Sequence, residues 1–147
     1  MNNITLKLAT EKDIPIYIEI EKSLSNLKTY SNMIDLKETK EEFKNNTVYM
    51  IKNNSKVVGS IQYKTIKPDH IHISGLAVGL KYQHQGIGKE ALTQILEKFK
   101  DIKRIDLVTH PDNPILNLYK SFGFVVGKRI ENYFGDGEPR VELVKIN

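Results

Sequence analysis

Apolar and polar residues alternate over short runs of this chain and recur at helical spacing over longer ones. The first run, residues 4–8, alternates and predicts a β-strand. Thr10 and Asp13 follow it and match a capping box, in which Pro15 is tolerable as a first-turn residue. The helix that they open has an apolar face made of Ile14, Ile16, Tyr17, Ile20 and Leu24.

The middle of the chain predicts a short helix and then an antiparallel meander. Residues 36–43 indicate the helix, with Asp35 as its cap. Asn53–Asn54 and Pro68–Asp69 are turn-favouring pairs between apolar runs. The strands that these turns separate are residues 48–51, 57–63 and 70–78.

The second half of the chain predicts two more helices around a buried strand. Apolar residues recur at spacings of three and four in Leu92, Ile95, Leu96 and Phe99. Residues 104–109 form the strand. Pro114 suits the first position of the next helix, which makes Asn113 its N-cap. That helix ends at Gly123.

Two final apolar runs, residues 124–130 and 141–146, predict a closing hairpin around residues 132–139. The chain has 147 residues and no repeat or linker, so we expect one α/β domain, residues 1–147. Its 39% hydrophobic and 27% charged residues are typical of a soluble globular protein. With no long apolar span and no signal-peptide core at the N-terminus, we expect no membrane contact and a cytoplasmic location.

The charge and the cysteine count narrow the possible chemistry. The absence of cysteine excludes disulfides, thiolate metal sites and a cysteine nucleophile. The net charge of +4 leaves nucleic acid as an alternative partner. Lysines are interleaved with glutamates and asparagines without a basic stripe, which instead favours a ligand that carries several phosphates. The four histidines are scattered, so we expect no metal site.

The segment that follows the strand at residues 70–78 has the features of a phosphate-binding loop. It reads Gln83-His84-Gln85-Gly86-Ile87-Gly88-Lys89 and opens a helix. The first N–H groups of a helix lack internal partners and lie at the positive end of its dipole. Gly86 and Gly88 carry no Cβ that would keep an anion away, and Lys89 adds a positive charge.

Two known phosphate motifs do not account for this loop. The pattern GxxxxGK[ST] is absent, which argues against a P-loop. Ala91 stands in a permitted place for the third glycine of GxGxxG, but no acidic residue follows a second strand to hold a ribose. We therefore interpret Gln83 to Lys89 as a diphosphate-binding loop of another kind, which we call the cradle.

Gln83-x-x-Gly86-x-Gly88, after a strand that ends Leu76-Ala77-Val78, resembles the [RQ]xxGx[GA] acetyl-coenzyme A signature of the GNAT superfamily of N-acetyltransferases. About thirty residues downstream, Leu118 to Phe124 resembles the superfamily's LYxxxGF element. The resemblance implies a mixed, mostly antiparallel twisted sheet of six to seven strands flanked by about four helices. It also implies acetyl transfer from acetyl-CoA to a primary amine of a small molecule or a peptide.

The resemblance assigns cofactor contacts to three parts of the chain. The backbone of Leu76, Ala77 and Val78 would pair with the pantetheine arm. The cradle would consist of Gln83, His84, Gln85, Gly86, Ile87, Gly88 and Lys89. Asn113 and Asn117 are further candidates, although the usual asparagine position holds Asp112. Tyr119 matches the tyrosine that protonates the departing thiolate, and a core role is its alternative.

The general base and the acceptor site stay open at this point. His72 and His110 are the candidate bases, and imidazole suits that task. Strand alternation places His72 on the face opposite to Ala77. Candidate acceptor contacts are Tyr30, Met33 and Tyr133, with Asp136 or Glu138 to attract a cation. Surface or core positions are the alternative for each of these residues.

Two wider alternatives also stay open. A coenzyme A-binding or sensing module of the same fold would keep the cradle and transfer nothing. Because some relatives pair through their C-terminal strands, the resemblance also makes a homodimer possible.

Overall fold

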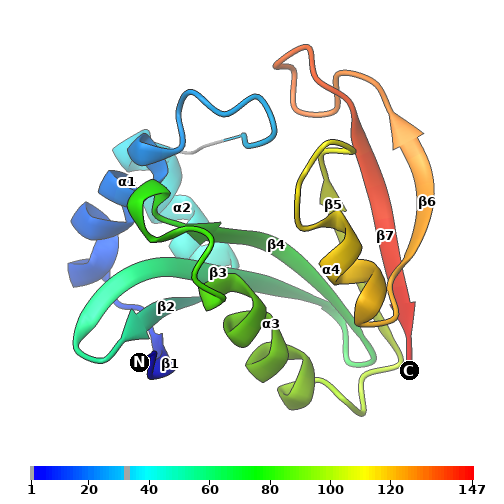
Figure 1. The fold of residues 1–147 in the computed structure, drawn as a ribbon, viewed down its shortest axis with the longest axis horizontal. Helices are drawn as coiled ribbons and strands as arrows, with labels where there is room; N and C mark the ends of the chain where they lie inside the picture. Colours follow the sequence, from blue (N-terminus) through cyan, green and yellow to red (C-terminus); the bar gives the residue numbers. More distant parts are fainter. Residues whose placement is uncertain (1, 32–33) are drawn as a thin grey trace.

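The computed structural model describes residues 2–31 and 34–147, which form one seven-stranded sheet in the order β1-β2-β3-β4-β5-β7-β6 (Figure 1). The strands are β1 (Ile4–Leu8), β2 (Thr47–Asn53), β3 (Lys56–Lys67), β4 (His70–Val78), β5 (Arg104–Thr109), β6 (Val125–Ile130) and β7 (Arg140–Ile146). The helices are α1 (Ile14–Ser23), α2 (Leu36–Asn45), α3 (Ile87–Lys98) and α4 (Leu116–Ser121). Among the described strands only β4 and β5 pair in parallel, so the predicted fold class is confirmed.

The predicted capping box forms at the start of the first helical segment. The backbone N–H of Thr10 donates to Asp13 Oδ2 over 2.8 Å, and the Thr10 hydroxyl accepts from Lys12 N. These bonds close a single 3-10 turn, η1 (Glu11–Asp13), and α1 continues directly from it. The cap therefore fixes where the chain leaves β1 and turns onto the sheet.

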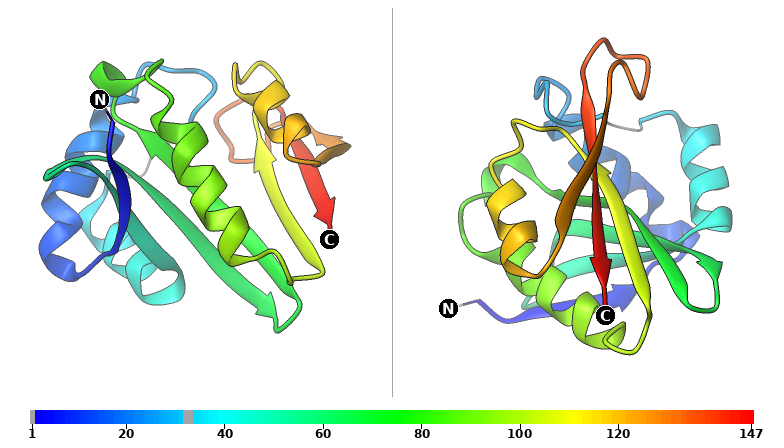
Figure 2. Two further views of the ribbon diagram at one scale, coloured as in Figure 1. Left: turned by 60° about the horizontal axis from the view of Figure 1, so that its bottom comes forward. Right: turned by 90° about the vertical axis from the view of Figure 1, so that its right-hand side faces the viewer.

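Helices cover both faces of the sheet (Figure 2). On one face α3 and α4 pack on a large apolar cluster that includes Ile61, Ile73 and Leu143. On the other face α1 and α2 pack on smaller clusters around Met50 and Ala77. The smaller clusters leave part of that face free for polar side chains.

A β-bulge in β4 overturns one expectation from strand alternation. Gly75 pairs with Gln62 and Ile73 pairs with Tyr63, so Ser74 is an extra residue in β4. A bulge shifts the alternation by one position. Ile73 therefore packs against α3, whereas Ala77 packs against α1.

The prediction that His72 lies on the face opposite to Ala77 was consequently wrong. Ser74, two residues after His72, bonds to Asn46 at the end of α2, and a Cβ on Gly75 would touch Gln62 on the α1 side. Residues 72, 74, 75 and 77 thus all face the α1 and α2 side, because the bulge separates the first pair from the second.

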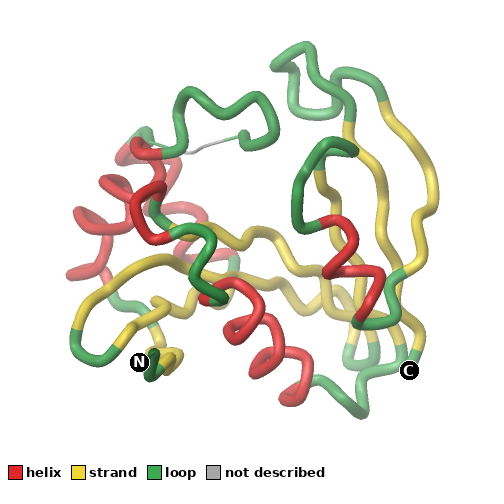
Figure 3. Tube along the Cα trace, in the orientation of Figure 1, coloured by secondary structure: helices red, strands yellow, loops and turns green. Residues whose placement is uncertain are grey.

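The sheet splits between β4 and β5. Their parallel pairing covers only three residue pairs, from His70↔Arg104 to His72↔Asp106. Beyond His72 the two strands diverge (Figure 1). Figure 3 shows that long loops surround the end of the sheet at which they separate. In the part of the chain that the structure describes, the later part of β4 therefore has a strand neighbour only on its β3 side.

The helix after β5 begins later than the sequence indicates. We expected Asn113 as its N-cap and Pro114 as its first residue, but α4 starts at Leu116. The Asn113 Oδ1 accepts instead from the N–H of Ile115 over 3.0 Å, and the Asn113 Nδ2 donates to Thr109. The asparagine closes a local turn that competes with the helix.

β6 is the last strand of the sheet, and all six of its residues are exposed. No helix in the described part of the chain is long and apolar enough to cross a membrane.

Candidate active site

Two cavities lie where β4 and β5 diverge. The first, which we call the α3 cavity, has a volume of about 570 Å³ and lies between the end of β4, the start of α3 and residues 113–118. The second, the α2 cavity, has a volume of about 460 Å³ and lies on the α1 and α2 side of the sheet. Both are lined by Thr29, Tyr30, Leu76 and Asn113, so they meet at these four residues.

The start of α3 offers unpaired backbone N–H groups to the α3 cavity. Glu90 N is the first amide to bond back into the helix, to Gly86 O at 3.1 Å, so the N–H groups of residues 87–89 have no acceptor within the helix. Gly86 caps the helix in the left-handed conformation, with φ of 79°, and a Cβ there would meet nothing within 4 Å. An anion can approach this helix end without a steric obstacle.

Most of the predicted cradle lines the α3 cavity. The residues that do so are Gln83, His84, Gly86, Ile87, Gly88 and Lys89. The side chain of Gln83 donates to Val78 O over 3.1 Å, which ties the loop to the end of β4. Gln85 does not line the cavity, and its carbonyl accepts from Asn2. The loop therefore presents one side to the cavity and attaches by its other side to the N-terminal segment.

The open edge of β4 forms the floor of the α3 cavity. Leu76, Ala77 and Val78 all line it, and β5 has already diverged from this part of the strand. A strand without a neighbour on one side presents backbone N–H and C=O groups that an extended ligand can use.

The phenol of Tyr119 contributes to the α2 cavity from α4. Tyr119 is 4% exposed, and its ring packs edge-on against the ring of Phe124, with 5.8 Å between the two ring centroids. Burial raises the pKa of the Tyr119 hydroxyl well above its ordinary value near 10, so the group stays protonated at neutral pH. The residues that the structure describes form no hydrogen bond to this hydroxyl, which leaves its proton available to a ligand.

His72 is held by a buried carboxylate on the neighbouring strand. Its Nδ1 lies 2.7 Å from Asp106 Oδ1, while Asp106 Oδ2 accepts from His70 Nε2 at 2.7 Å and from Arg104 Nε at 2.9 Å. Burial opposes ionisation of Asp106, but hydrogen bonds from His72, Arg104 and His70 lower its pKa overall. A carboxylate only accepts, so Nδ1 of His72 carries a proton, and Nε2 is the acceptor nitrogen of the neutral imidazole.

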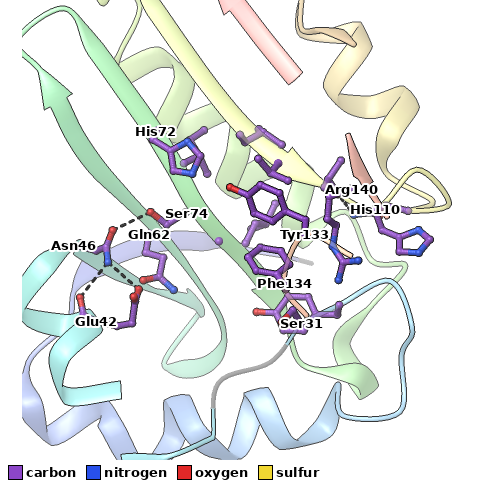
Figure 4. Close-up of a pocket in the computed structure, with 18 of the residues that line it drawn as sticks. Ser31, Glu42, Asn46, Gln62, His72, Ser74, His110, Tyr133, Phe134 and Arg140 are labelled. Carbon is purple, nitrogen blue, oxygen red and sulfur yellow. Dashed lines mark hydrogen bonds between the residues drawn. The ribbon is translucent and has the colours of Figure 1, made fainter. Parts of the chain in front are cut away.

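The two candidate bases, His72 and His110, differ in whether one ring nitrogen is free of hydrogen bonds. The side chain of His72 is 32% exposed and lines the α2 cavity, and its Nε2 has no hydrogen-bond partner in the described part of the chain (Figure 4). His110 is 1% exposed, and both of its nitrogens are engaged. Its Nδ1 accepts from Asp112 N at 2.9 Å, and its Nε2 lies 2.8 Å from Glu138 Oε1.

The remaining predicted residues fall into three groups. Tyr30 and Tyr133 line the α2 cavity, whereas Met33 lies outside the described residues. Asp136 and Glu138 are already bonded to Arg140 and His110. Asn117 is exposed and lines neither cavity, and Asp112 forms a surface ion pair with Lys28 at 3.3 Å.

Several polar residues of the α2 cavity were not predicted. Glu21 is 2% exposed and accepts from the Tyr30 hydroxyl over 2.6 Å. Burial and the neighbouring Glu21 raise the pKa of Tyr30. Glu21 lies one turn from Tyr17 on the apolar face of α1. A charged residue on the apolar face of a helix is a sequence signal that could have identified Glu21 as a site residue. Glu42, Asn46, Gln62 and Arg140 complete this set, and Asp106 lies behind it as the partner of His72.

The sequence profile of the acetyltransferase (GNAT) family matches residues 17–124, which is most of the chain. The chain belongs to this family. A curated relative, the N-alpha-acetyltransferase of Sulfolobus acidocaldarius, is 29% identical over 92% of this chain and 88% of its own length.

Solved structures share the fold of this acetyltransferase. A GNAT family acetyltransferase from Elizabethkingia anophelis with acetyl-CoA bound has a TM-score of 0.79, with 21% identity and full coverage of both chains. A ribosomal-protein-alanine N-acetyltransferase from Brucella melitensis has a TM-score of 0.80, with 20% identity, and covers 97% of this chain and 99% of its own.

Acetyl-CoA is the cofactor of this GNAT acetyltransferase. The α3 cavity fits that molecule in its chemistry, because it combines unpaired N–H groups for phosphate with an open strand edge for an extended amide-containing arm. In the described part of the chain, no group of three metal-ligating side chains lies close enough to hold an ion.

Proposed function

We propose that this enzyme transfers the acetyl group of acetyl-CoA directly to a primary amine. One observation carries the proposal: the α3 cavity and the α2 cavity meet at Thr29, Tyr30, Leu76 and Asn113. A cofactor in the first cavity and an amine in the second would place their reacting ends at this junction. Holding two reactants together in this way removes much of the entropic cost of the reaction.

The cofactor would lie with its pyrophosphate on the N-terminal end of α3 and its pantetheine arm along Leu76, Ala77 and Val78. The thioester would then lie beside Leu76 at the junction. A backbone N–H of Leu76 or Val78 would donate to the thioester oxygen, and it would stabilise the negative charge that develops there.

His72 is the proposed general base, acting through a water molecule in the α2 cavity. Its free Nε2 supports this role, since both nitrogens of His110 are engaged. Asp106 supports it further, because a carboxylate on Nδ1 fixes the tautomer that can accept a proton at Nε2. The sequence contains no cysteine, so we propose attack by the amine without a covalent enzyme intermediate.

The neutral amine would attack the thioester carbon and form a tetrahedral adduct. Collapse of this adduct breaks the C–S bond, and the departing thiolate takes the proton of the Tyr119 hydroxyl. The surplus proton on the amide nitrogen passes through water to the Tyr119 phenolate, which restores the neutral phenol. Tyr119 lines the α2 cavity, and its hydroxyl has no hydrogen-bond partner among the described residues, which supports Tyr119 as the acid. The new amide leaves from the α2 cavity and coenzyme A from the α3 cavity.

The acceptor is either a small primary amine or the amine of a peptide. The name of the Sulfolobus relative supports the α-amine of a polypeptide as one candidate. Tyr30 and Tyr133 line the α2 cavity and would contact the acceptor.

The test combines cofactor binding with turnover. Acetyl-CoA should raise the midpoint of thermal unfolding, because a ligand that binds the native state stabilises it. A panel of primary amines should then release free thiol in an acetyl-CoA-dependent manner. A shift without thiol release from any amine would favour the alternative, a coenzyme A-binding module, and absence of a shift at millimolar acetyl-CoA would contradict both.

We also propose that two copies pair through β6. This strand ends the sheet, and Val125 and Ile130 are among its exposed residues, which supports an edge-to-edge contact. A monomeric mass in solution at all concentrations tested would exclude it.

A further inference from the structure

The α2 cavity is much larger than one amino group, and its two walls differ in chemistry. One wall carries Glu42, Asn46, Gln62 and Ser74, and the opposite wall carries Tyr133 and Phe134 (Figure 4). Both aromatic rings are partly exposed, and they pack edge-on against each other at 4.7 Å. The Arg140 guanidinium already lies over the Phe134 ring, 5.1 Å from its centroid, so Glu42 and the Tyr133 ring are the groups of the two walls that suit a further cation.

Gln62 has a buried amide whose oxygen has no partner among the described residues. The side chain is 7% exposed, and its Nε2 donates to the Tyr17 hydroxyl over 2.9 Å. The Oε1 atom has no hydrogen-bond partner among the described residues. An unpaired buried amide oxygen is costly, so it indicates a group that is paired when a ligand is present.

The Tyr17 hydroxyl lies among carboxylates. Burial raises the pKa of Tyr17, and the charges of Glu21 and Glu42 raise it further, while the hydrogen bond from Gln62 opposes them. The two carboxylates and the unpaired oxygen of Gln62 thus share one neighbourhood around this hydroxyl. Their combined negative character would be reduced by a ligand that donates N–H groups.

Glu42 is the carboxylate of this group that a ligand can reach. Its Oε2 accepts from Asn46 Nδ2 at 2.8 Å, and that amide in turn accepts from Ser74 at 2.8 Å, which fixes the carboxylate toward the cavity wall. Partial burial raises the pKa of Glu42, and the charge of Lys64 opposes this only in part. Lys64 is itself exposed and can turn to solvent.

This wall lies at a distance from the junction at which the reacting amine is proposed to lie. Ser74 precedes Leu76 by two positions on β4. At about 3.3 Å per residue, the wall at Ser74 is roughly 7 Å from the junction. A group bound there belongs to the same acceptor as the reacting amine, several bonds away from it.

We infer that the acceptor carries a second cationic group and that this group binds between Glu42 and the free oxygen of Gln62, opposite Tyr133 and Phe134. The inference rests on the proposed function and narrows its substrate class. The shared chemistry is an ammonium or guanidinium several bonds from the reacting amine. A free diamine and a peptide with a basic side chain next to its N-terminus both provide it.

The experiment compares acceptors that differ only in the second charge. Putrescine is paired with butylamine and cadaverine with pentylamine, and a Ser-Lys peptide is paired with a Ser-norleucine peptide. We expect kcat/KM for the dicationic member to be at least about tenfold higher in one of these series, in line with a partly desolvated charge pair. The series that shows the difference distinguishes a small diamine from a peptide.

Glu42→Gln tests whether this wall makes the difference. The variant should lower the dication-to-monocation ratio by about five- to tenfold and leave the rate with the monocation largely unchanged. Glu38→Gln is the matched control, because Glu38 lies one turn earlier on α2, is exposed and lines neither cavity. Equal ratios within every pair, or equal effects of the two variants, would overturn the inference.

A binding measurement keeps the inference separate from the proposed function. Calorimetric titration of the coenzyme A complex with putrescine and butylamine needs no turnover. Preferential binding of putrescine that Glu42→Gln removes would sustain the second site even if no amine were acetylated. Equal binding of the two amines, or binding of neither, together with no preference in the peptide pair, would contradict it.

Discussion

The α3 cavity and the α2 cavity are built in different ways. The first relies on backbone groups from one continuous stretch, the end of β4 and the loop that leads into α3. The second relies on side chains that arrive from α1, α2, α4, the four strands β3, β4, β5 and β7, and the loop before β7. A backbone site depends on conformation and tolerates many side chains, whereas a side-chain site changes with each residue. We therefore expect substitutions in the α3 cavity to act through the backbone conformation and substitutions in the α2 cavity to act through the loss of single side chains.

The largest effect is expected at Tyr119. Tyr119→Phe removes the proposed acid and keeps the buried ring, so kcat should fall by about a hundredfold or more. The shift of the unfolding midpoint by acetyl-CoA should stay as it is. Tyr63→Phe is the control, since Tyr63 packs on Phe99 in the core at 4.7 Å and lies outside both cavities. A fully active Tyr119→Phe enzyme would remove the acid from the mechanism.

A somewhat smaller effect is expected at His72. His72→Asn should lower kcat by tens of fold, because bulk water can partly replace the base. His110→Asn should have its main effect on stability, since that histidine bonds to Asp112 and Glu138 inside the fold. Initial rates and unfolding midpoints of the two variants separate these effects. The reverse pattern would make His110 the base.

Gly86 and Gly135 allow the backbone site to be tested with a matched pair. Both have φ of 79°, and a Cβ added at either glycine would meet no atom within 4 Å. Valine at either position forces a β-branched residue into the left-handed region, which costs about 1–2 kcal/mol. Both variants should lose similar stability, but only Gly86→Val should lose stabilisation by acetyl-CoA, with KM for acetyl-CoA raised about tenfold or more. Equal cofactor binding by the two variants would contradict the cradle.

The smallest effect is expected at Asp106 and depends on pH. The pKa of Asp106 is lowered in the folded protein, so its contribution to stability is present above the unfolded value near 3.8 and is lost as pH falls through the folded value. Asp106→Asn should therefore lower the unfolding midpoint by several degrees at neutral pH, and the difference should shrink below about pH 4. A difference that persists unchanged in acid would mean that the carboxylate charge is not involved.

The contrast between the cavities also explains what the sequence could predict. The loop from Gln83 to Lys89 was readable because its residues are consecutive and glycine at a helix start has a local physical meaning. Glu42, Gln62 and Asp106 were not predicted, since each acts through partners that only the folded sheet brings near. The predicted orientation of the His72 side chain was wrong because one extra residue at Ser74 shifts the alternation. Gly75, a glycine inside the strand pattern, was the sequence signal for that bulge.

The pairing between β4 and β5 extends over few residues, and this affects how easily the two halves of the sheet can bend relative to each other. Strands β1 to β4 form one continuous half of the sheet and strands β5 to β7 form the other; their strand pairing covers three residue pairs, and the apolar cluster under α3 and α4 spans both halves. Bending at this hinge would change the widths of both cavities together, because they share Tyr30, Leu76 and Asn113. A cofactor lying along β4 would brace the hinge before an acceptor arrives. The enzyme is therefore expected to bind its two substrates in a compulsory order, acetyl-CoA first and the amine second.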